Sequence, residues 1–151
     1  MAIGTNSAVE YFGTTDTVTS SSSALVDGGF SSSADVITWV NDDDAPIAAF
    51  LFEAAFAVAP SANSFVNLYA RPMNVSGVND SDVPDGNFNH VYLGAFPINN
   101  VTTRQYVSID ARLSNLKSSQ EYEFYIENNA GQTLSAAWVL KVTPKTIGPH
   151  A

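Results

Sequence analysis

Apolar and polar residues alternate along most of this chain, and this period of two limits the fold more than any other feature. In residues 106–113, for example, apolar positions alternate with Ser108, Asp110 and Arg112. Successive side chains of a strand point to opposite faces, whereas an amphipathic helix would need a period of 3.6. We therefore expect strands wherever the pattern recurs, in residues 34–40, 47–58, 65–70, 91–96, 106–113, 122–126 and 134–142.

Turn-forming clusters separate these segments. Residues 42–46, 59–63 and 128–131 are rich in Asp, Asn, Pro and Gly, which favour turns, and a long polar loop spans 72–89. About seven to nine short strands joined in this way predict an all-β fold, an antiparallel two-sheet β-sandwich of the jelly-roll type, over residues 34–151. The residues predicted for its core are Phe50, Phe52, Phe56, Val66, Leu68, Val107, Ile109, Phe124, Ile126 and Leu140.

The first 33 residues differ from the rest. They are rich in Ser and Thr and contain only short apolar pieces at 9–12 and 24–26. Such a segment is typical either of edge strands or of an extended N-terminal arm that becomes ordered on a partner. Both interpretations remain open at this point.

The charge narrows the range of partners. Six Lys and Arg residues stand against 15 Asp and Glu residues, which gives a formal net charge of -9. Binding to phosphate backbones or anionic lipid surfaces needs clustered cations, so we expect neither nucleic acid nor a membrane as a partner. The first residues contain no basic region followed by an apolar run, so we expect synthesis in a cytoplasm without a signal peptide.

The sequence offers little for catalysis. There is no Cys and no Gly-x-Ser-x-Gly motif, and the two histidines, His90 and His150, suggest no triad. Glu53 is the best candidate for a perturbed carboxylate because it lies in an apolar segment, although we favour a solvent-facing or subunit-contact position for it. We expect no enzyme, no catalytic residue and no cofactor.

Two acidic clusters are candidates for calcium sites. Residues 80–86 resemble a calcium-binding loop, but Pro84 occupies a ligand position and no Glu follows at the twelfth place. The Asp42–Asp44 triplet would need a special turn to converge on one ion. We therefore predict no metal.

Exposed aromatic side chains on a sandwich would indicate sugar binding instead. The available residues are Trp39, Tyr92, Tyr106, Tyr125 and Trp138. Tyr125 has the opposite parity to Phe124, which predicts that its ring is exposed.

From Ile47 onward, several stretches occur in a distinctive order: IAAFLFEAAFAVAPSANSFVNLYARPM, VPDGN, VYLGAFPI, TTRQYVSI and YEFYIENNAGQTLSA. In this order they resemble a family of small virion proteins of tailed bacteriophages. The resemblance implies a capsid decoration, or cement, protein on the exterior of the virion, with the major capsid protein and other copies of itself, as a homotrimer, for partners. The first 45 residues lie outside this resemblance; from their Ser- and Thr-rich composition we expect an arm that contacts the capsid through Ile3, Val9, Tyr11, Phe12 and Val18. The alternative function is a carbohydrate-binding module, displayed on a virion or free.

Overall fold

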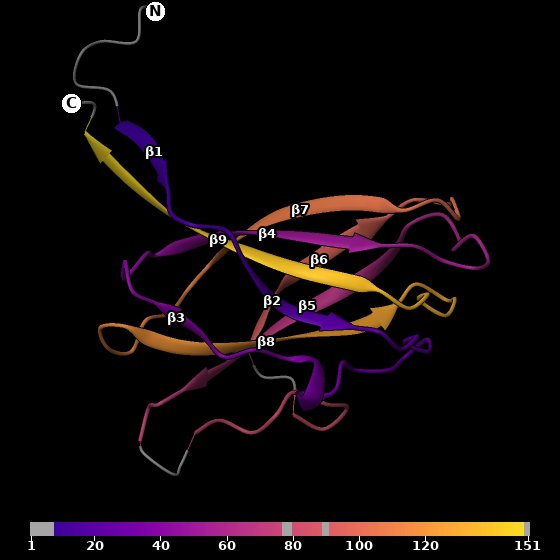
Figure 1. The fold of residues 1–151 in the computed structure, drawn as a ribbon, viewed down its shortest axis with the longest axis horizontal. Coiled ribbons are helices and arrows are strands. Elements are labelled where there is room, and N and C mark those ends of the chain that lie inside the picture. The colour runs from indigo at the N-terminus through magenta and orange to yellow at the C-terminus, as the bar shows by residue number, and fades with distance from the viewer. Residues whose placement is uncertain (1–7, 77–79, 89–90, 150–151) are drawn as a thin grey trace, which may run out of the picture.

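Two antiparallel sheets packed face to face form the protein, which confirms the predicted β-sandwich (Figure 1). The computed structural model describes residues 8–76, 80–88 and 91–149. Its elements are β1 (Ala8–Phe12), β2 (Asp16–Ser21), the 3₁₀ helix η1 (Ser33–Asp35), β3 (Trp39–Asn41), β4 (Ile47–Ala54), β5 (Ser64–Met73), β6 (Tyr92–Ile98), β7 (Gln105–Arg112), β8 (Gln120–Asn129) and β9 (Trp138–Pro149). Within the described ranges, no helix has the length and apolar character needed to cross a membrane.

The order of the strands decides which residues share a face. Sheet I contains β1-β9-β4-β7, and β2 also pairs with β9; sheet II contains β3-β8-β5-β6. The long strand β9 pairs with β1, β2 and β4, so it joins the beginning of the chain to its end. In sheet II, β5 lies between β6 and β8, and the outer face of these three strands carries the site described below.

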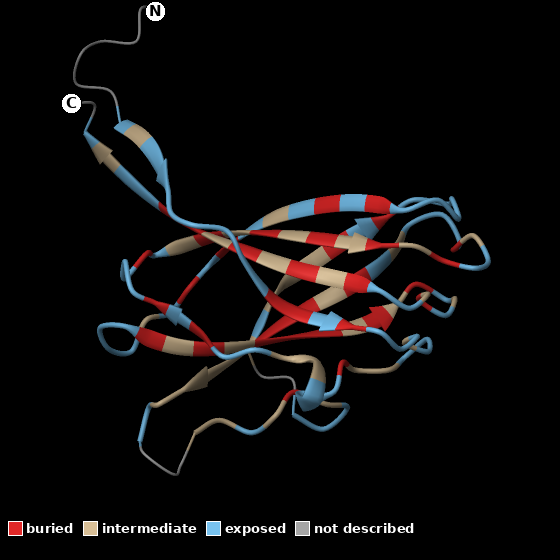
Figure 2. Ribbon diagram, in the orientation of Figure 1, coloured by how far each residue is buried: buried red, intermediate tan, exposed pale blue. Residues whose placement is uncertain are grey.

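Alternation of buried and exposed residues along the strands places the core between the sheets (Figure 2). Phe50 of sheet I meets Phe124 of sheet II edge to face, with ring centroids 4.9 Å apart. Nine of the ten predicted core residues are buried, and the tenth, Ile109, is partly buried against the same cluster. The period of two was therefore read in the correct register in each of these strands.

Of the two edge strands at the beginning of the chain, β2 packs onto the body of the sandwich. β1 and β2 are edge strands that pair with β9. Val18 is 1% exposed and belongs to the core, and the hydroxyl of Thr19 donates to the carbonyl of Phe124 at 2.6 Å. The assignment of Val18 to a contact arm is thus wrong, while Ile3 lies outside the described residues.

Residues 34–40 also differ from the expectation of a continuous strand. Ser32 caps η1 by accepting from the backbone N–H of Ala34, and the Asp35 carboxylate accepts from the N–H of Ser32. These local hydrogen bonds compete with strand pairing, so only Trp39–Asn41 joins sheet II.

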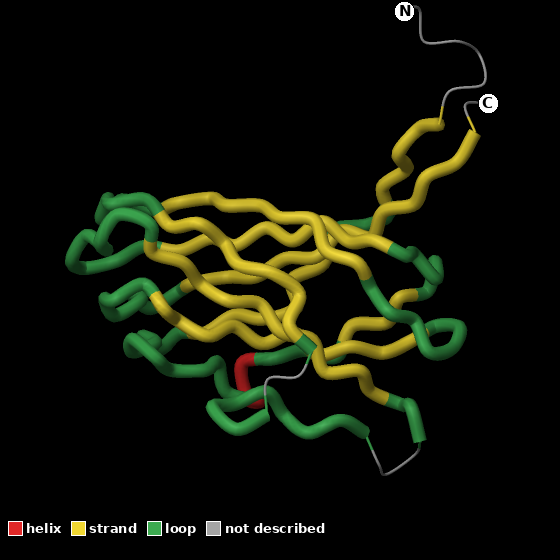
Figure 3. Tube along the Cα trace, turned by 180° about the vertical axis from the view of Figure 1, so that it is seen from behind, coloured by secondary structure: helices red, strands yellow, loops and turns green. Residues whose placement is uncertain are grey.

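β1 and the end of β9 leave the body of the sandwich together. Figures 1 and 3 show these two strands projecting as a separate two-stranded ribbon on the side where both ends of the chain lie. The register pairs Ala8 with Pro149 and Phe12 with Lys145. Below, "the ribbon" means Ala8–Phe12 with Lys145–Pro149.

Candidate functional site

The outer face of sheet II carries a row of aromatic, amide and carboxylate side chains, which we call the outer strip: Phe65, Asn67, Tyr69, Tyr92 and Glu127. Val66, Leu68 and Ala70 of β5 point into the core, so the alternate residues Phe65, Asn67 and Tyr69 point outward. The strand register then sets Tyr92 opposite Tyr69, and Glu127 opposite Asn67.

Glu127 is held in place by two donors from β5. Its Oε2 atom accepts from Asn67 Nδ2 at 2.8 Å and from the Tyr69 hydroxyl at 2.9 Å. Burial, together with this hydrogen bond to Glu127, raises the pKa of Tyr69 to about 12, so its phenol stays a donor at neutral pH. Within the described part of the chain, no Lys or Arg pairs with Glu127. The two donors therefore fix the orientation of the carboxylate.

Two aromatic rings flank the buried Tyr69. The centroids of Phe30 and Tyr92 each lie 5.6 Å from the Tyr69 centroid. Phe30 comes from the segment that pairs with β8, where it lies opposite Glu127. Tyr69 is only 4% exposed, whereas Tyr92 is 54% exposed and Phe65 is 42% exposed. The strip thus presents two open rings to solvent, on either side of the polar pair.

A bulge in β6 gives Tyr92 its direction. Tyr92 and Ala95 are three residues apart and would point to opposite faces of a regular strand. The pairing with β5 shifts by one residue between Leu68 and Tyr69, which turns Tyr92 outward beside Ala95. Gly94 lies at this shift, where an added Cβ would come within 3.0 Å of Ile109 Cδ1.

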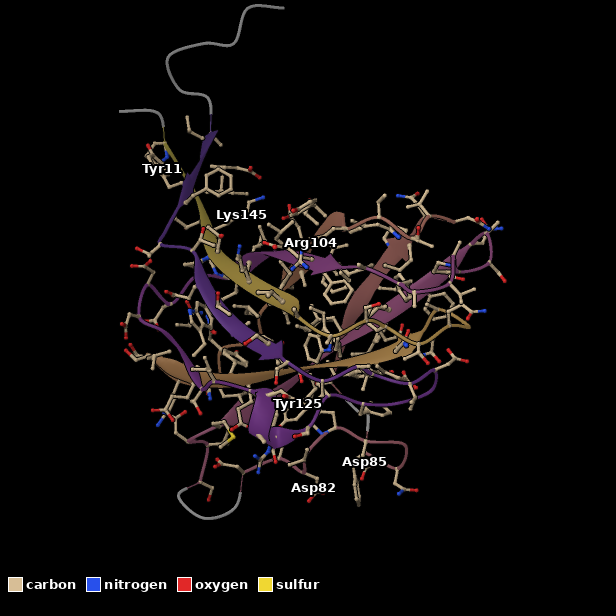
Figure 4. The ribbon with its side chains drawn as sticks, turned by 45° about the vertical axis from the view of Figure 1, so that its right-hand side comes forward. Tyr11, Asp82, Asp85, Arg104, Tyr125 and Lys145 are labelled. Atoms are coloured by element: carbon tan, nitrogen blue, oxygen red, sulfur yellow. The ribbon has the colours of Figure 1, made fainter. Side chains whose placement is uncertain are left out.

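A second polar network lies beside the strip and holds the 80–88 segment. Arg71 donates to Glu123 at 2.9 Å and to the carbonyl of Ser81 at 2.6 Å, and Tyr125 donates to Glu123 at 2.8 Å. The prediction that Tyr125 is exposed is wrong, because it is fully buried and burial raises its pKa to about 12. Figure 4 shows Tyr125 on the side of the molecule that carries Asp82 and Asp85.

Glu53 belongs to sheet I and is far from the strip in the fold. It pairs with Lys141 and, at 3.5 Å, with Arg104 (labelled in Figure 4). The hydrogen bond from Lys141 holds the pKa of Glu53 below its ordinary value despite the opposing effect of burial. An ionised, paired carboxylate of this kind is not a general acid.

The acidic clusters accept hydrogen bonds from within the protein: Asp85 from its own turn, and Asp44 from the loop between β7 and β8. Asp85 accepts from the N–H groups of Asn87 and Phe88 at 2.6 and 2.9 Å, and Asp44 accepts from Ser118 and Ser119. Over residues 8–76, 80–88 and 91–149, no three metal-binding side chains converge. His90 and His150 lie outside the described residues.

Only two of the five aromatic candidates are open to solvent. Trp39 and Trp138 are buried at 6% and 1% exposure, whereas Tyr92 and Tyr106 are 54% and 65% exposed. Tyr106 lies on sheet I, opposite Glu53 in the register, so it is not part of the strip. The sequence analysis did not identify Asn67, Tyr69 and Glu127 as a group. The alternation along each strand does place Asn67 and Tyr69 on the same face as Phe65, and Glu127 on the same face as Tyr125.

Comparison with known proteins finds likeness at the level of structure only. No family model matches the sequence, and no curated protein matches it either. A C-terminal family 6 carbohydrate-binding module of a marine laminarinase from Zobellia galactanivorans aligns with a TM-score of 0.47 and 10% identity, over 91% of this chain and 99% of that one. A family 35 module from Cellvibrio japonicus aligns with a TM-score of 0.38 and 15% identity, over 96% and 99%. A module of a Cellvibrio mixtus lichenase, solved with cellotriose, has a TM-score of 0.38 and 10% identity, over 91% and 97%.

These comparisons correct the function expected from the sequence. The similar structures are carbohydrate-binding modules and not virion proteins, so the prediction of a capsid decoration protein is wrong. With identities of 10–15% the likeness concerns the arrangement of strands, and the ligand has to be inferred from the residues of the outer strip.

Proposed function

We propose that this protein is a non-catalytic module that binds a neutral glycan on the outer strip of sheet II. The observation that carries the proposal is the exposed ring of Tyr92 beside the oriented pair Asn67 and Glu127. The C–H face of a sugar ring packs against an aromatic ring, while the sugar's hydroxyl groups need fixed donors and acceptors. The strip supplies both within neighbouring strands.

The dimensions of the strip favour an oligosaccharide over a single sugar. Phe65 and Tyr69 are four residues apart on β5, which separates their rows by about 13 Å at the usual rise of a strand. Tyr92 stands in the Tyr69 row, so the two open rings lie at the ends of this span with the polar pair between them. A chain of sugars laid along β5 reaches both rings.

The charge of the strip favours a neutral ligand. Glu127 is an acidic side chain with no cationic partner among the described side chains. An anionic sugar would meet this carboxylate at close range, and like charges repel strongly near a partly buried site. Hydroxyl groups of a neutral sugar, by contrast, donate readily to a carboxylate.

The same residues argue against glycoside hydrolysis. Hydrolases need two carboxylic groups flanking the scissile bond, one of them with a raised pKa. The strip contains one carboxylate, Glu127, and its neighbour Glu123 is committed to Arg71 and Tyr125. Binding without turnover is the function that fits this set.

The test is a glycan array followed by titration calorimetry of each hit with two tyrosine variants. Tyr92→Ala removes the ring of the strip, while Tyr106→Ala removes an equally exposed ring from sheet I. We expect Tyr92→Ala to weaken binding at least tenfold, about 1.4 kcal/mol, and Tyr106→Ala to leave it unchanged. Absence of any glycan binding, or a loss confined to Tyr106→Ala, would show that the strip is not the site.

A further inference from the structure

The ribbon is held together by its own side chains. Tyr11 donates its hydroxyl to the carbonyl of Pro149 at 2.8 Å, and its ring lies so close to Gly148 that an added Cβ there would be 3.1 Å from it. On β9, Lys145 Nζ lies 5.2 Å from the Phe12 ring centroid and 3.3 Å from Glu10. Each of these contacts joins β1 to β9, so specific side-chain interactions hold the ribbon together. Tyr11 and Lys145 are labelled in Figure 4.

The ribbon exposes three large apolar side chains to solvent. Tyr11, Phe12 and Ile147 are 44%, 61% and 56% exposed. A two-stranded ribbon with open faces is only marginally stable in water, and exposed apolar residues beside a free strand edge are a site for pairing with another chain. The exposed apolar side chains of the ribbon therefore indicate that another protein surface covers them.

The ribbon also has a free edge beside a groove. β4 pairs with β9 only as far as Ile47 opposite Lys145, so within the described residues Thr146–Pro149 have β1 as their single neighbour. A groove of about 390 Å³ opens along this edge. Its apolar lining comes from Pro46, Ile47, Leu113 and Ile147.

The distribution of charge over the chain indicates which partner covers the ribbon. The whole chain carries -9, and two such chains repel each other over most of their surfaces. Lys145 of the ribbon contacts two acids, Glu10 at 3.3 Å and Asp110 of β7 at 2.7 Å, and Arg112 lines the groove beside them. Two acids and two bases thus balance here, so the ribbon and its groove form a near-neutral part of an acidic molecule. A basic partner would be drawn to the acidic surfaces instead, whereas a second copy meets least repulsion here.

We propose that two copies of this chain associate through their ribbons. The free edges of the two β9 strands pair antiparallel about a two-fold axis, and Ile147 of each copy enters the groove of the other. A single patch that contacts its own equivalent gives a closed dimer and no further growth. Strand pairing supplies the backbone hydrogen bonds, while Phe12 and Ile147 leave water.

The test is sedimentation equilibrium of the full chain over a wide range of concentration. Ile147→Asp places a charge in the groove, and Ile37→Asp is a matched control because Ile37 is 55% exposed elsewhere on the surface. We expect a concentration-dependent dimer that Ile37→Asp retains and Ile147→Asp weakens at least tenfold. Phe12→Asp should weaken it as well. Added salt should strengthen the dimer because it screens the repulsion between acidic chains.

Both ribbon variants leave the sandwich core untouched, so their near-UV circular dichroism should match the original and show that they fold. A monomer at every concentration overturns the proposal. So does an assembly of any size, including a trimer, that Ile147→Asp leaves intact. The tyrosine variants of the outer strip should dimerise normally, which separates this result from that of the glycan assay.

Discussion

Replacing Phe124 by Ala tests how the two sheets are joined. Phe124 is fully buried, and its ring lies 4.9 Å from Phe50, 5.8 Å from Tyr122 and 5.9 Å from Trp39, measured between centroids. Large-to-small changes at such sites lose the transfer free energy of the ring and leave a cavity, which together cost about 3–5 kcal/mol. Loss of the edge-to-face contact with Phe50 places the expected cost in the upper half of that range.

Urea unfolding followed by tryptophan fluorescence measures this cost. Phe124→Leu is the control, because it keeps most of the volume and should lose clearly less than Ala. The unfolding slope should remain unchanged in both variants if the native fold persists. A loss below about 1 kcal/mol for Phe124→Ala would refute the reasoning, since no fully buried phenylalanine between two sheets is removed so cheaply.

Two further predictions concern pH and metal. Burial raises the pKa of Tyr69, Tyr122 and Tyr125 to about 12, whereas phenols of the unfolded chain ionise near pH 10. The unfolded state therefore releases these protons first, so the free energy of unfolding should fall between about pH 10 and 12, by up to about 2–3 kcal/mol per tyrosine. Tyrosinate absorbance and urea unfolding across this range check it, and constant stability would contradict the burial of the three phenols. Thermal unfolding should have the same midpoint with and without a strong chelator, and a midpoint several degrees lower in the chelator would reveal a bound ion.

The sequence predicts which way most side chains of the outer strip point, but it does not predict that they lie together as one site. The parity of residues 65–70 puts Phe65, Asn67 and Tyr69 on one face, and the parity of 122–126 extends to Glu127. The alternation within one strand does not show which other strands pair with it. Because β5 lies between β6 and β8, residues from three separate stretches meet, and no spacing in the sequence encodes that order.

Tyr125 shows where parity is insufficient. Its direction was predicted correctly, away from the core between the sheets, yet its ring is fully buried. A face that points outward in one sheet can still be covered, here beside the network in which Arg71 binds Ser81 and Glu123. Exposure is a property of everything packed on a face, whereas parity reports only which face a residue takes.

The sequence by itself determined the class of fold and ten residues of the core, but not the burial of Val18, Trp39 and Trp138. A period of two and frequent turn residues act locally, and a register error would expose a whole set of apolar side chains, so the core members were fixed strand by strand. Tertiary structure alone decided the rest. The pairing of β1 and β2 with β9, the bulge that turns Tyr92 outward and the free edge of Thr146–Pro149 all depend on contacts between distant segments. Such contacts depend on the order of the strands in the two sheets, and the alternation of neighbouring residues does not encode that order.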